Sequence, residues 1–480
     1  MSVRTRFAPS PSGRLHLGNL RTAVLCWLYA RQHGGQFLLR LDDTDASRSR
    51  AEHVQAIEAD LRWLGLEYDE RFCQSERLAR YEEVFAELKS AGHIYACYET
   101  PEELALKRTQ QLARGRPPRY DRAALKLTEA DKARREQEGR RPHWRLRLSG
   151  ARAEWQDMVR GPQKVATMSL SDPVVRRADG AFLYTLPSAV DDVDYRISHI
   201  IRGEDHVTNT AVQLELLRCL NARPPHFGHH PLVVEADGSA LSKRNKARGL
   251  EALAAAGYQP RALRAYLAQL GQSQPAAGDG EAGEEPPLQL EAMGRSALRF
   301  SDADLKRLNA RYLRAMAYQE VQPLLQERGC DGGEAFWLAM RGNISLLADL
   351  PPFYAMLTQR PALELASEDR TFLSEAADLL PPEPWDEGSW QTWVDALKAA
   401  TPRKGAALFQ PLRLALTGLA HGPEMRVLLP LLGRERATER LRATQKKIKF
   451  IIRTSFVVQE DDARVVQKDD ANLMGRLKKT

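Results

Sequence analysis

The segment from Arg6 to Asn19, which reads Arg-Phe-Ala-Pro-Ser-Pro-Ser-Gly-Arg-Leu-His-Leu-Gly-Asn, constrains the fold more than any other part of the chain. Pro9 and Pro11 fix φ and bar a helix before residue 12. From Leu17 onward, apolar residues recur at helical spacing. The sequence therefore predicts an extended strand, a proline-containing turn, and then a helix whose first turn begins at His16.

Two elements of the chain are typical of phosphate binding. At the start of the predicted helix, unpaired N–H groups and the helix dipole favour an anion, and Gly18 lets a flat ring or a phosphate approach the backbone. Residues 237–246 form a loop in which Ser242, Lys243 and Arg244 offer donors for polyphosphate charge. Alone, each element reads as a helix-capping loop or a solvated basic loop. Together, in this order, they predict a nucleotide site.

The first 95 residues alternate strand-like and helix-like segments. We expect strands at 4–8 and 36–41 and helices at 17–33, 50–64 and 75–91. Such alternation predicts an α/β fold of the Rossmann type, in which ligands bind at the carboxyl ends of parallel strands. The pattern resumes at residue 181, where we expect a strand at 182–186, an acidic turn at Asp191 and Asp192, and a strand at 197–201.

A basic segment, residues 96–180, lies between these two parts. Residues 101–150 contain 14 Lys and Arg against 7 Asp and Glu, an excess that equals the net charge of +7 for the whole chain. A solvated helix face with i,i+4 pairs explains about half of this charge. The rest predicts contact with a polyanion, for which an RNA strand is the best candidate.

Beyond residue 300 the leucine spacing is helical, and no run of alternating strands with hairpin turns is evident. No apolar run approaches the roughly 20 residues of a membrane span, and the N-terminus lacks the apolar segment of a signal peptide. The five cysteines are scattered without a metal-ligand spacing. We therefore expect a cytoplasmic protein of more than one domain, without disulfides or membrane contact.

Motifs along residues 3–441 resemble those of bacterial-type glutamyl-tRNA synthetase, a class I aminoacyl-tRNA synthetase. They lie at residues 6–19, 39–45, 63–70, 74–77, 118–121, 184–192, 200–206, 241–244, 304–313 and 410–418. The resemblance implies a catalytic half with a connective insertion, followed by an all-α anticodon-binding half. It divides the chain into a Rossmann-type domain (1–95 and 181–235), an insertion that binds the acceptor end of tRNA (96–180), a Lys-Ser-Lys-type loop with a stem-contact region (236–300), a helical anticodon-binding region (301–441) and a tail of no assigned role (442–480).

The resemblance also implies a glutamate pocket. Arg6 and Arg202 would bind the side-chain carboxylate, because a buried guanidinium rejects neutral glutamine. Asp42 would accept the α-ammonium group; for it and for Arg202 the alternative is a structural ion pair. The walls of the pocket would be Ser10, Tyr184 and Ser188.

The implied reaction consumes ATP and has two steps: attack of glutamate on the α-phosphate with release of pyrophosphate, then transfer of the glutamyl group to the 3′ end of tRNA(Glu), which releases AMP. The residues implied to bind ATP are His16, Gly18, Asn19, Glu204, Val233 and Lys243, and those implied to act in catalysis are His16, Ser242, Lys243 and Arg244. Mg²⁺ would screen the phosphates.

Some positions depart from the family pattern. Ala240 stands where the family's loop carries its first lysine, and Asp42 stands where many members carry glutamate. Zinc-binding members carry a Cys-x-Cys and a later Cys/His pair in the insertion. Here Cys97 is alone and residues 120–123 supply no thiol, so we predict no zinc site.

The substrate tRNA is left open by the sequence. A non-discriminating enzyme would also glutamylate tRNA(Gln); discrimination in some members uses an arginine near Arg341, and either Arg341 or Asn343 occupies that position. A catalytically weakened tRNA-binding paralogue is a further alternative, which Ala240 favours slightly. A glutaminyl-tRNA synthetase would carry β-barrels in place of the helical half. The family implies a monomer.

Overall fold

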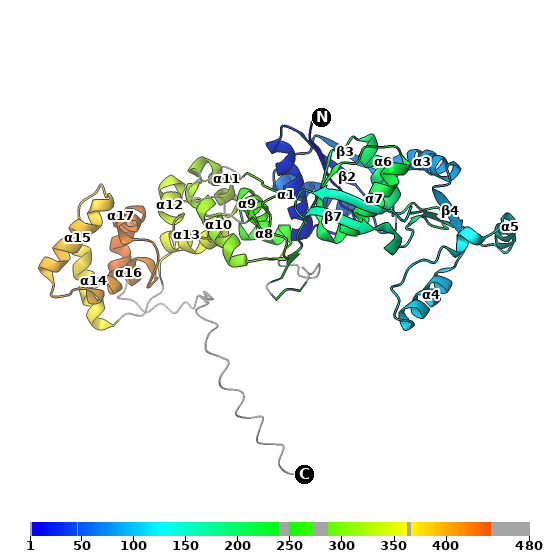
Figure 1. The fold of residues 1–480 in the computed structure, drawn as a ribbon. Helices are drawn as coiled ribbons and strands as arrows, with labels where there is room; N and C mark the ends of the chain where they lie inside the picture. Colours follow the sequence, from blue (N-terminus) through cyan, green and yellow to red (C-terminus); the bar gives the residue numbers. More distant parts are fainter. Residues whose placement is uncertain are drawn as a thin grey trace, which may run out of the picture. The chain divides into compact units, whose positions relative to one another are not determined.

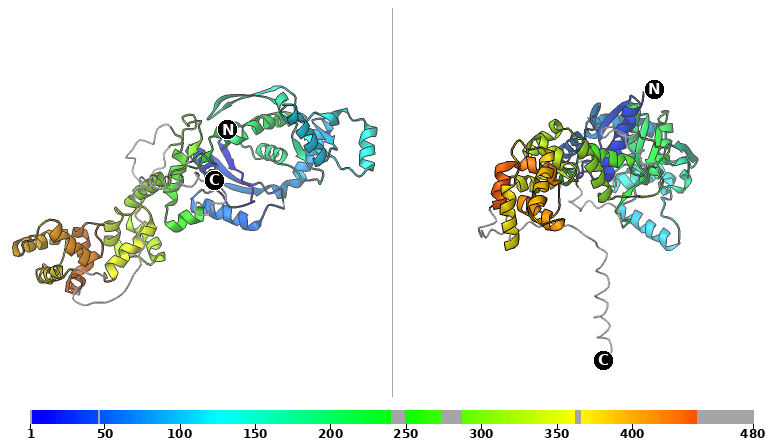
Figure 2. Two further views of the ribbon diagram at one scale, coloured as in Figure 1. Left: turned by 90° about the horizontal axis from the view of Figure 1, so that it is seen from below. Right: turned by 90° about the vertical axis from the view of Figure 1, so that its left-hand side faces the viewer.

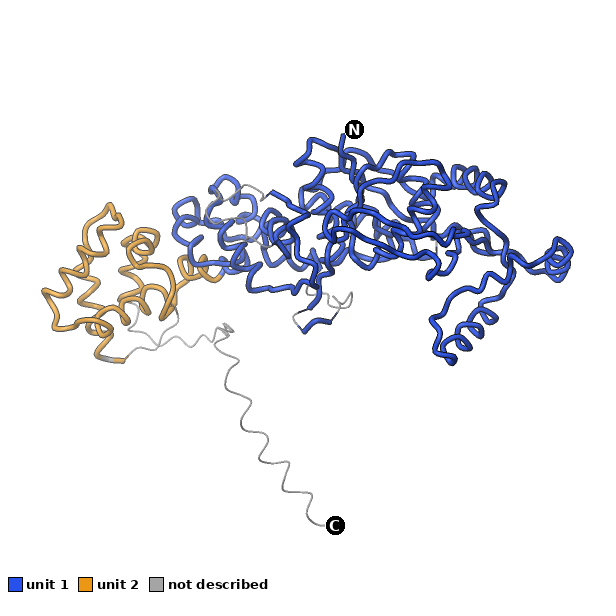
Figure 3. The backbone as a smooth tube through the Cα atoms, in the orientation of Figure 1, with its two compact units in different colours: residues 1–351 blue, residues 352–480 orange. Residues whose placement is uncertain are grey.

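The computed structural model describes residues 2–45, 47–235, 237–239, 249–272, 287–361 and 366–442. The predicted catalytic residues Ser242, Lys243 and Arg244, together with Ala240, lie outside the described residues, as do residues 443–480 of the predicted tail. The chain divides into two units, Met1–Pro351 and Pro352–Thr480 (Figure 3).

A seven-stranded sheet organises the first unit, in the order β3-β2-β1-β9-β10-β6-β7. Its strands are β1 (Arg4–Phe7), β2 (Gln36–Leu41), β3 (Glu70–Cys73), β6 (Arg152–Asp157), β7 (Gly161–Ala166), β9 (His199–Gly203) and β10 (His226–His230). All neighbouring strands pair in parallel except β6 and β7, which pair antiparallel. The predicted α/β class is confirmed.

Helices cover both faces of this sheet (Figures 1 and 2). On one face, α1 (Leu17–Gln32), α2 (Ala51–Trp63) and α9 (Pro260–Gln269) share a buried apolar cluster with Leu39. On the other, Leu38 packs in a cluster that includes Leu214 of α7 (Val207–Cys219). Neighbouring residues of β2 thus face opposite helix layers, which explains why this strand has buried apolar residues on both of its faces.

The expected strand at 182–186 and the acidic turn at Asp191 and Asp192 are wrong. Phe182 forms only an isolated bridge, and α6 (Thr185–Asp194) contains both aspartates. Pro187 falls in the first turn of this helix, where its missing N–H removes no helical hydrogen bond. Both carboxylates are buried: Asp192 pairs with Arg6 of β1 and Arg40 of β2, whereas Asp191 accepts from Gln74, Arg77 and Tyr81.

The segment predicted as an insertion has two structural parts. A separate three-stranded antiparallel sheet consists of β4 (Ile94–Cys97), β5 (His143–Leu146) and β8 (Val174–Arg176), and α4 (Pro101–Ala113) and α5 (Glu129–Gln137) lie beyond it (Figure 1). Strands β6 and β7, in contrast, extend the seven-stranded sheet. Further elements of this unit are α3 (Leu78–Ser90) and the 3₁₀ turns Gln74–Arg77, Ala123–Lys126, Thr167–Ser169 and Glu204–His206.

The second half of the chain is helical, as predicted. The short strands β11 (Val233–Val234) and β12 (Leu298–Arg299) pair with each other, and α8 (Leu250–Ala256) and α9 lie between them in the chain. The elements after β12 are α10 (Asp302–Ala315), α11 (Tyr318–Glu327), α12 (Gly333–Met340), the 3₁₀ turn Leu347–Asp349, α13 (Leu350–Thr358), α14 (Ser367–Asp378), α15 (Glu387–Ala400), α16 (Ala406–Thr417) and α17 (Met425–Arg442). The boundary between the units falls inside the predicted region 301–441, so α10, α11 and α12 belong to the first unit. Within the described ranges, every helix is too short or too polar to cross a membrane.

Candidate active site

A cavity of about 590 Å³ opens at the carboxyl ends of β1 and β9, beside the first turn of α1. The predicted site residues that line it are Arg6, Ser10, His16, Gly18, Asn19, Asp42, Tyr184, Arg202 and Val233. Residues from distant parts of the sequence therefore meet where ligands of parallel sheets bind. Two predicted residues, Ser188 and Glu204, lie behind this lining.

His16 is the N-cap of α1, and its ring folds back over the helix start. Its Nδ1 accepts a hydrogen bond from the backbone N–H of Asn19 (3.3 Å), while the Asn19 side chain accepts one from the backbone N–H of His16 (3.4 Å). A Cβ at Gly18 would lie 3.1 Å from the His16 ring, so glycine permits this close contact. The arrangement fixes an imidazole at the positive end of a helix, where developing anionic charge is stabilised.

Three arginines are buried at the floor of the cavity or directly behind it, and they differ in their ionic partners. The Nε of Arg6 donates to Asp192 (2.9 Å). Arg40, only 1% exposed, donates to Asp42 (2.7 Å) and to Asp192 (3.0 Å). Asp191 also lies 3.9 Å from Arg40 Nε, so three buried carboxylates surround these two guanidinium groups.

Arg202 is the exception. The residue is only 5% exposed, and its guanidinium donates to four neutral acceptors: His229 Nε2 (3.2 Å), Tyr184 Oη (3.2 Å), Thr210 Oγ1 (2.6 Å) and Gln213 Oε1 (2.8 Å). Among the described residues, no carboxylate lies within ion-pair distance of it. A buried cation without a counter-ion is costly, so this position favours an anionic ligand. The structural ion pair that we considered for Arg202 does not occur within that part of the chain.

Asp42 does form the ion pair that we considered as its alternative, with Arg40, yet it also lines the cavity. Burial raises the pKa of Asp42 to about 6 despite the neighbouring Arg40. A carboxylate has lone pairs for more than one donor. Asp42 can therefore accept from an ammonium group in the cavity while it holds Arg40.

Ser188 and Glu204 act on neighbours of the cavity. The Ser188 hydroxyl accepts from Arg40 Nη2 (2.9 Å) in the fully buried layer below it. Glu204 forms an ion pair with Arg160 (2.5 Å) and accepts from the backbone N–H of Leu232 (3.3 Å). Ser188 is thus placed to orient Arg40, and Glu204 is placed at the edge where β11 begins.

Part of the positive charge of the basic insertion is neutralised by acidic residues of the same segment. Ion pairs hold Lys107, Arg122, Lys132, Arg134 and Arg140. A second cavity of about 320 Å³ in this region is lined by Lys107, Arg108, Arg119 and Arg145 around the Tyr120 ring. The Tyr120 ring is itself buried, with Arg145 4.1 Å from its centre, so the basic side chains and not the ring are the groups that a polyanion could contact.

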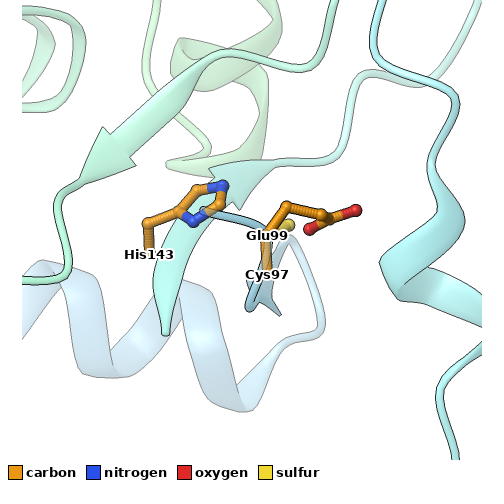
Figure 4. Close-up of side chains that lie close together, drawn as sticks. All are labelled: Cys97, Glu99 and His143. Atoms are coloured by element: carbon orange, nitrogen blue, oxygen red, sulfur yellow. The ribbon is translucent and has the colours of Figure 1, made fainter. Parts of the chain in front are cut away.

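Cys97 is not isolated in space, although it is isolated in the sequence. The antiparallel register pairs Cys97 with His143, and Glu99 lies beside them (Figure 4). One ligand atom from each lies within 4.8 Å of the others, and Glu99 Oε2 and His143 Nε2 are buried without a hydrogen-bond partner. However, Glu99 Oε1 accepts from Tyr120 (2.8 Å) and Lys107 (3.3 Å). Burial raises the pKa of the Cys97 thiol to about 11.

Structural zinc takes four ligands with deprotonated thiols. The three groups supply one ligand fewer than that, and the absence of zinc stays a prediction. The strand pairing that gathers these groups is not visible in the sequence.

Of the groups that hold the arginines, the sequence analysis named Asp42, Ser188 and Tyr184 as site residues but not the others. Arg40 had a signal, since a charged residue inside an apolar strand must be paired. Asp192 was placed in a turn, and His229 and Asp157 fell outside every motif that we weighed. In the helical half, Arg341 donates to the backbone oxygen of Met316 (3.2 Å).

Comparison with known proteins agrees with this architecture. The model of the family described as tRNA synthetases class I (E and Q), catalytic domain, matches residues 2–284, and the model described as anticodon binding domain matches residues 300–445.

Curated relatives match nearly the whole chain. Glutamate–tRNA ligase 1 of Rhodospirillum rubrum is 51% identical over 92% of this chain and 99% of its own length, and glutamate–tRNA ligase 1 of Parvibaculum lavamentivorans is 50% identical over 91% and 97%. Among solved structures, a glutamate–tRNA ligase of Elizabethkingia meningosepticum in complex with its amino acid superposes with a TM-score of 0.80 at 25% identity, covering 92% of this chain and 99% of that one.

Proposed function

Because this chain belongs to the class I aminoacyl-tRNA synthetases, and within them to the glutamate–tRNA ligases, we propose that it attaches L-glutamate to the 3′ end of tRNA(Glu). The reaction consumes ATP and proceeds through glutamyl-adenylate with release of pyrophosphate and AMP. The single observation that best supports the substrate is Arg202, a buried cation without a carboxylate partner among the described residues.

In this proposal, the glutamate side chain lies against Arg202 and Arg6, and its ammonium group against Asp42. Tyr184 and Ser10 supply hydrogen bonds at the walls, since both line the cavity. Glutamine would leave the charge of Arg202 unpaired, so it would bind poorly. Ser188 contributes by orienting Arg40.

ATP lies at the start of α1. His16 stabilises charge that develops on the α-phosphate while the glutamate carboxylate attacks it, and Gly18, Asn19 and Val233 line the nucleotide end of the cavity. Glu204 would approach the ribose, and Ser242, Lys243 and Arg244 would close over the phosphates. The described lining of the cavity contains two carboxylates, Asp42 and Asp205, and Asp42 is already paired with Arg40. Because this leaves Asp205 as the one described lining carboxylate outside the Arg40 network, we expect Mg²⁺ to be held chiefly by the phosphates of ATP. That ion would screen phosphate charge.

The partner tRNA would contact the basic insertion with its acceptor end and the helical region 301–441 with its anticodon. We expect the enzyme to act as a monomer in the cytoplasm and without zinc. No specific feature of the described residues favours tRNA(Gln) as a second substrate. Arg341, the candidate residue for tRNA discrimination, is oriented by its hydrogen bond to the backbone oxygen of Met316.

The test is ATP-dependent attachment of labelled glutamate to purified tRNA(Glu) and, separately, to tRNA(Gln), with Lys243→Ala as the control. Charging of tRNA(Glu) that Lys243→Ala impairs supports the proposal. Charging of both tRNAs would make the enzyme non-discriminating. Charging of neither, with intact tRNA binding, would indicate a catalytically weakened paralogue and refute the proposal.

A further inference from the structure

Below Arg202 lies a buried pair of titratable groups that the proposed reaction does not use. His229, on β10, is fully buried, and its Nδ1 lies 2.5 Å from Asp157 Oδ2 at the end of β6. Its other ring nitrogen, Nε2, faces Arg202 Nε at 3.2 Å. The three side chains therefore form a line from the sheet interior to the cavity floor.

The hydrogen-bond donors fix the protonation of the ring. Arg202 Nε carries a proton and can only donate, so His229 Nε2 must accept. The Thr210 hydroxyl, which accepts from Arg202 Nη2, lies 2.9 Å from the same nitrogen and can donate to it. The single ring proton must then sit on Nδ1, where Asp157 accepts it.

Asp157 is itself held rigidly. Its Oδ1 accepts from the backbone N–H groups of Val159, Arg160 and His229, each at 3.0 Å. Burial alone would raise the pKa of Asp157, but the His229 hydrogen bond and these backbone donors lower it to about 2. Burial also lowers the pKa of His229, which keeps the ring neutral beside Arg202.

We propose that Asp157 and His229 are positioning residues for glutamate selection: Asp157 holds His229 in the Nδ1–H tautomer, whose Nε2 lone pair fixes the Arg202 guanidinium toward the cavity. The proposal rests on the proposed role of Arg202 in glutamate binding. A neutral ring supplies an acceptor without supplying a negative charge. Arg202 is thus oriented by its protein partners while its charge stays available to the ligand.

The decisive variant is Asp157→Asn. The three backbone N–H groups hold the amide oxygen in the place of Oδ1, so the amide NH₂ faces His229 Nδ1 and Trp155 Nε1, which donates to Asp157 at 3.3 Å in the native protein. The NH₂ group donates to His229 Nδ1 and moves the ring proton to Nε2. The Nε2–H of His229 and the Nε–H of Arg202 then face each other as two donors without an acceptor. The matched control is Asp69→Asn, which also changes a carboxylate that accepts a backbone N–H (Phe37, 2.7 Å) but lies away from the cavity.

We would measure aminoacylation of tRNA(Glu) with L-glutamate and ATP, and the His229 tautomer by ¹⁵N NMR of histidine-labelled protein, assigned by the signal lost in a His229 variant. The expected result is a rise in the KM for glutamate of about 10- to 100-fold with little change in the KM for ATP, and a shift of the ring proton from Nδ1 to Nε2. An unchanged KM for glutamate, or a raised KM with an unchanged tautomer, would overturn the proposal.

If Asp157→Asn does not fold, two substitutions of His229 test the proposal in its place. His229→Gln can place an amide oxygen near the site of Nε2, whereas His229→Asn reaches only toward Asp157. We expect His229→Gln to retain a KM for glutamate at least about tenfold lower than His229→Asn; equal or reversed values would refute the proposal. Failure of the proposed function is a separate outcome, because Arg202→Gln would then leave glutamate binding unchanged as well.

Discussion

Replacing Arg202 by glutamine removes the buried charge to which we assign glutamate recognition. A guanidinium has five N–H donors, and four neutral acceptors among the described residues use four of them. One N–H, on Nη1, is therefore left for the ligand. One charge-assisted hydrogen bond contributes about 1.5–3 kcal/mol, which corresponds to about 10- to 150-fold in kcat/KM.

The assay is steady-state aminoacylation with glutamate and with ATP varied in turn. We expect Arg202→Gln to lower kcat/KM for glutamate by about 10- to 150-fold and to change the KM for ATP by less than about twofold. Arg202→Lys should fall between the variant and the native enzyme, because an ammonium keeps the charge but loses the planar fork. The matched control is Arg71→Gln. It removes an arginine of β3 that pairs with Glu58 of α2 at 3.0 Å.

Two results would refute this reasoning. The first is a loss in kcat/KM for glutamate below about threefold, which is too small for a charge-assisted hydrogen bond. The second is an equal loss for glutamate and ATP, which would indicate a general change of the cavity. Thermal unfolding of both variants checks that the fold is intact.

Four further predictions follow from individual positions. His16→Ala should lower kcat by about 100- to 1,000-fold in pyrophosphate exchange with tRNA present; a change in KM alone would contradict its role. Because burial raises the pKa of Asp42 to about 6, its carboxylate becomes protonated as the pH falls through 6, so the KM for glutamate should rise below that pH in the native enzyme and not in Asp42→Asn. Mass spectrometry of metals should find far less than one zinc per chain, and stoichiometric zinc at Cys97 would overturn that expectation. Gly257→Ala should destabilise the fold by about 1–3 kcal/mol in urea unfolding, because Gly257 has a φ of +87° and a Cβ there would lie 2.6 Å from Leu347; an unchanged midpoint would contradict this.

The elements that local patterns define were predicted well. The strand β2 begins and ends at the predicted residues, and α1 ends one residue before the predicted end. Both depend on the periodicity of neighbouring residues. The helix α6 was missed because Pro187 resembles a helix breaker unless its place in the first turn is known.

Non-local pairing could not be predicted. Strand β6 joins the main sheet through Asp157, which pairs with Phe227 seventy residues later, so the sequence assigned it to the insertion. The same holds for the site: the family resemblance placed Arg6 and Arg202 in one pocket, but their protein partners could not be predicted. Asp192 reaches Arg6 only because α6 is a helix, and His229 reaches Arg202 only because β9 and β10 are neighbours.

The three buried arginines of the site explain how one cavity can select a carboxylate. Arg40 lies within ion-pair distance of three aspartates, one of which, Asp192, also pairs with Arg6, and Arg202 is paired with none among the described residues. The positive potential is therefore strongest beside Arg202, and an incoming carboxylate gains most there. An amide can accept one hydrogen bond at the same place but cannot neutralise the charge, and the desolvated guanidinium then stays uncompensated. In our proposal, selectivity for glutamate over glutamine therefore requires both the arginine and the absence of a protein carboxylate beside it.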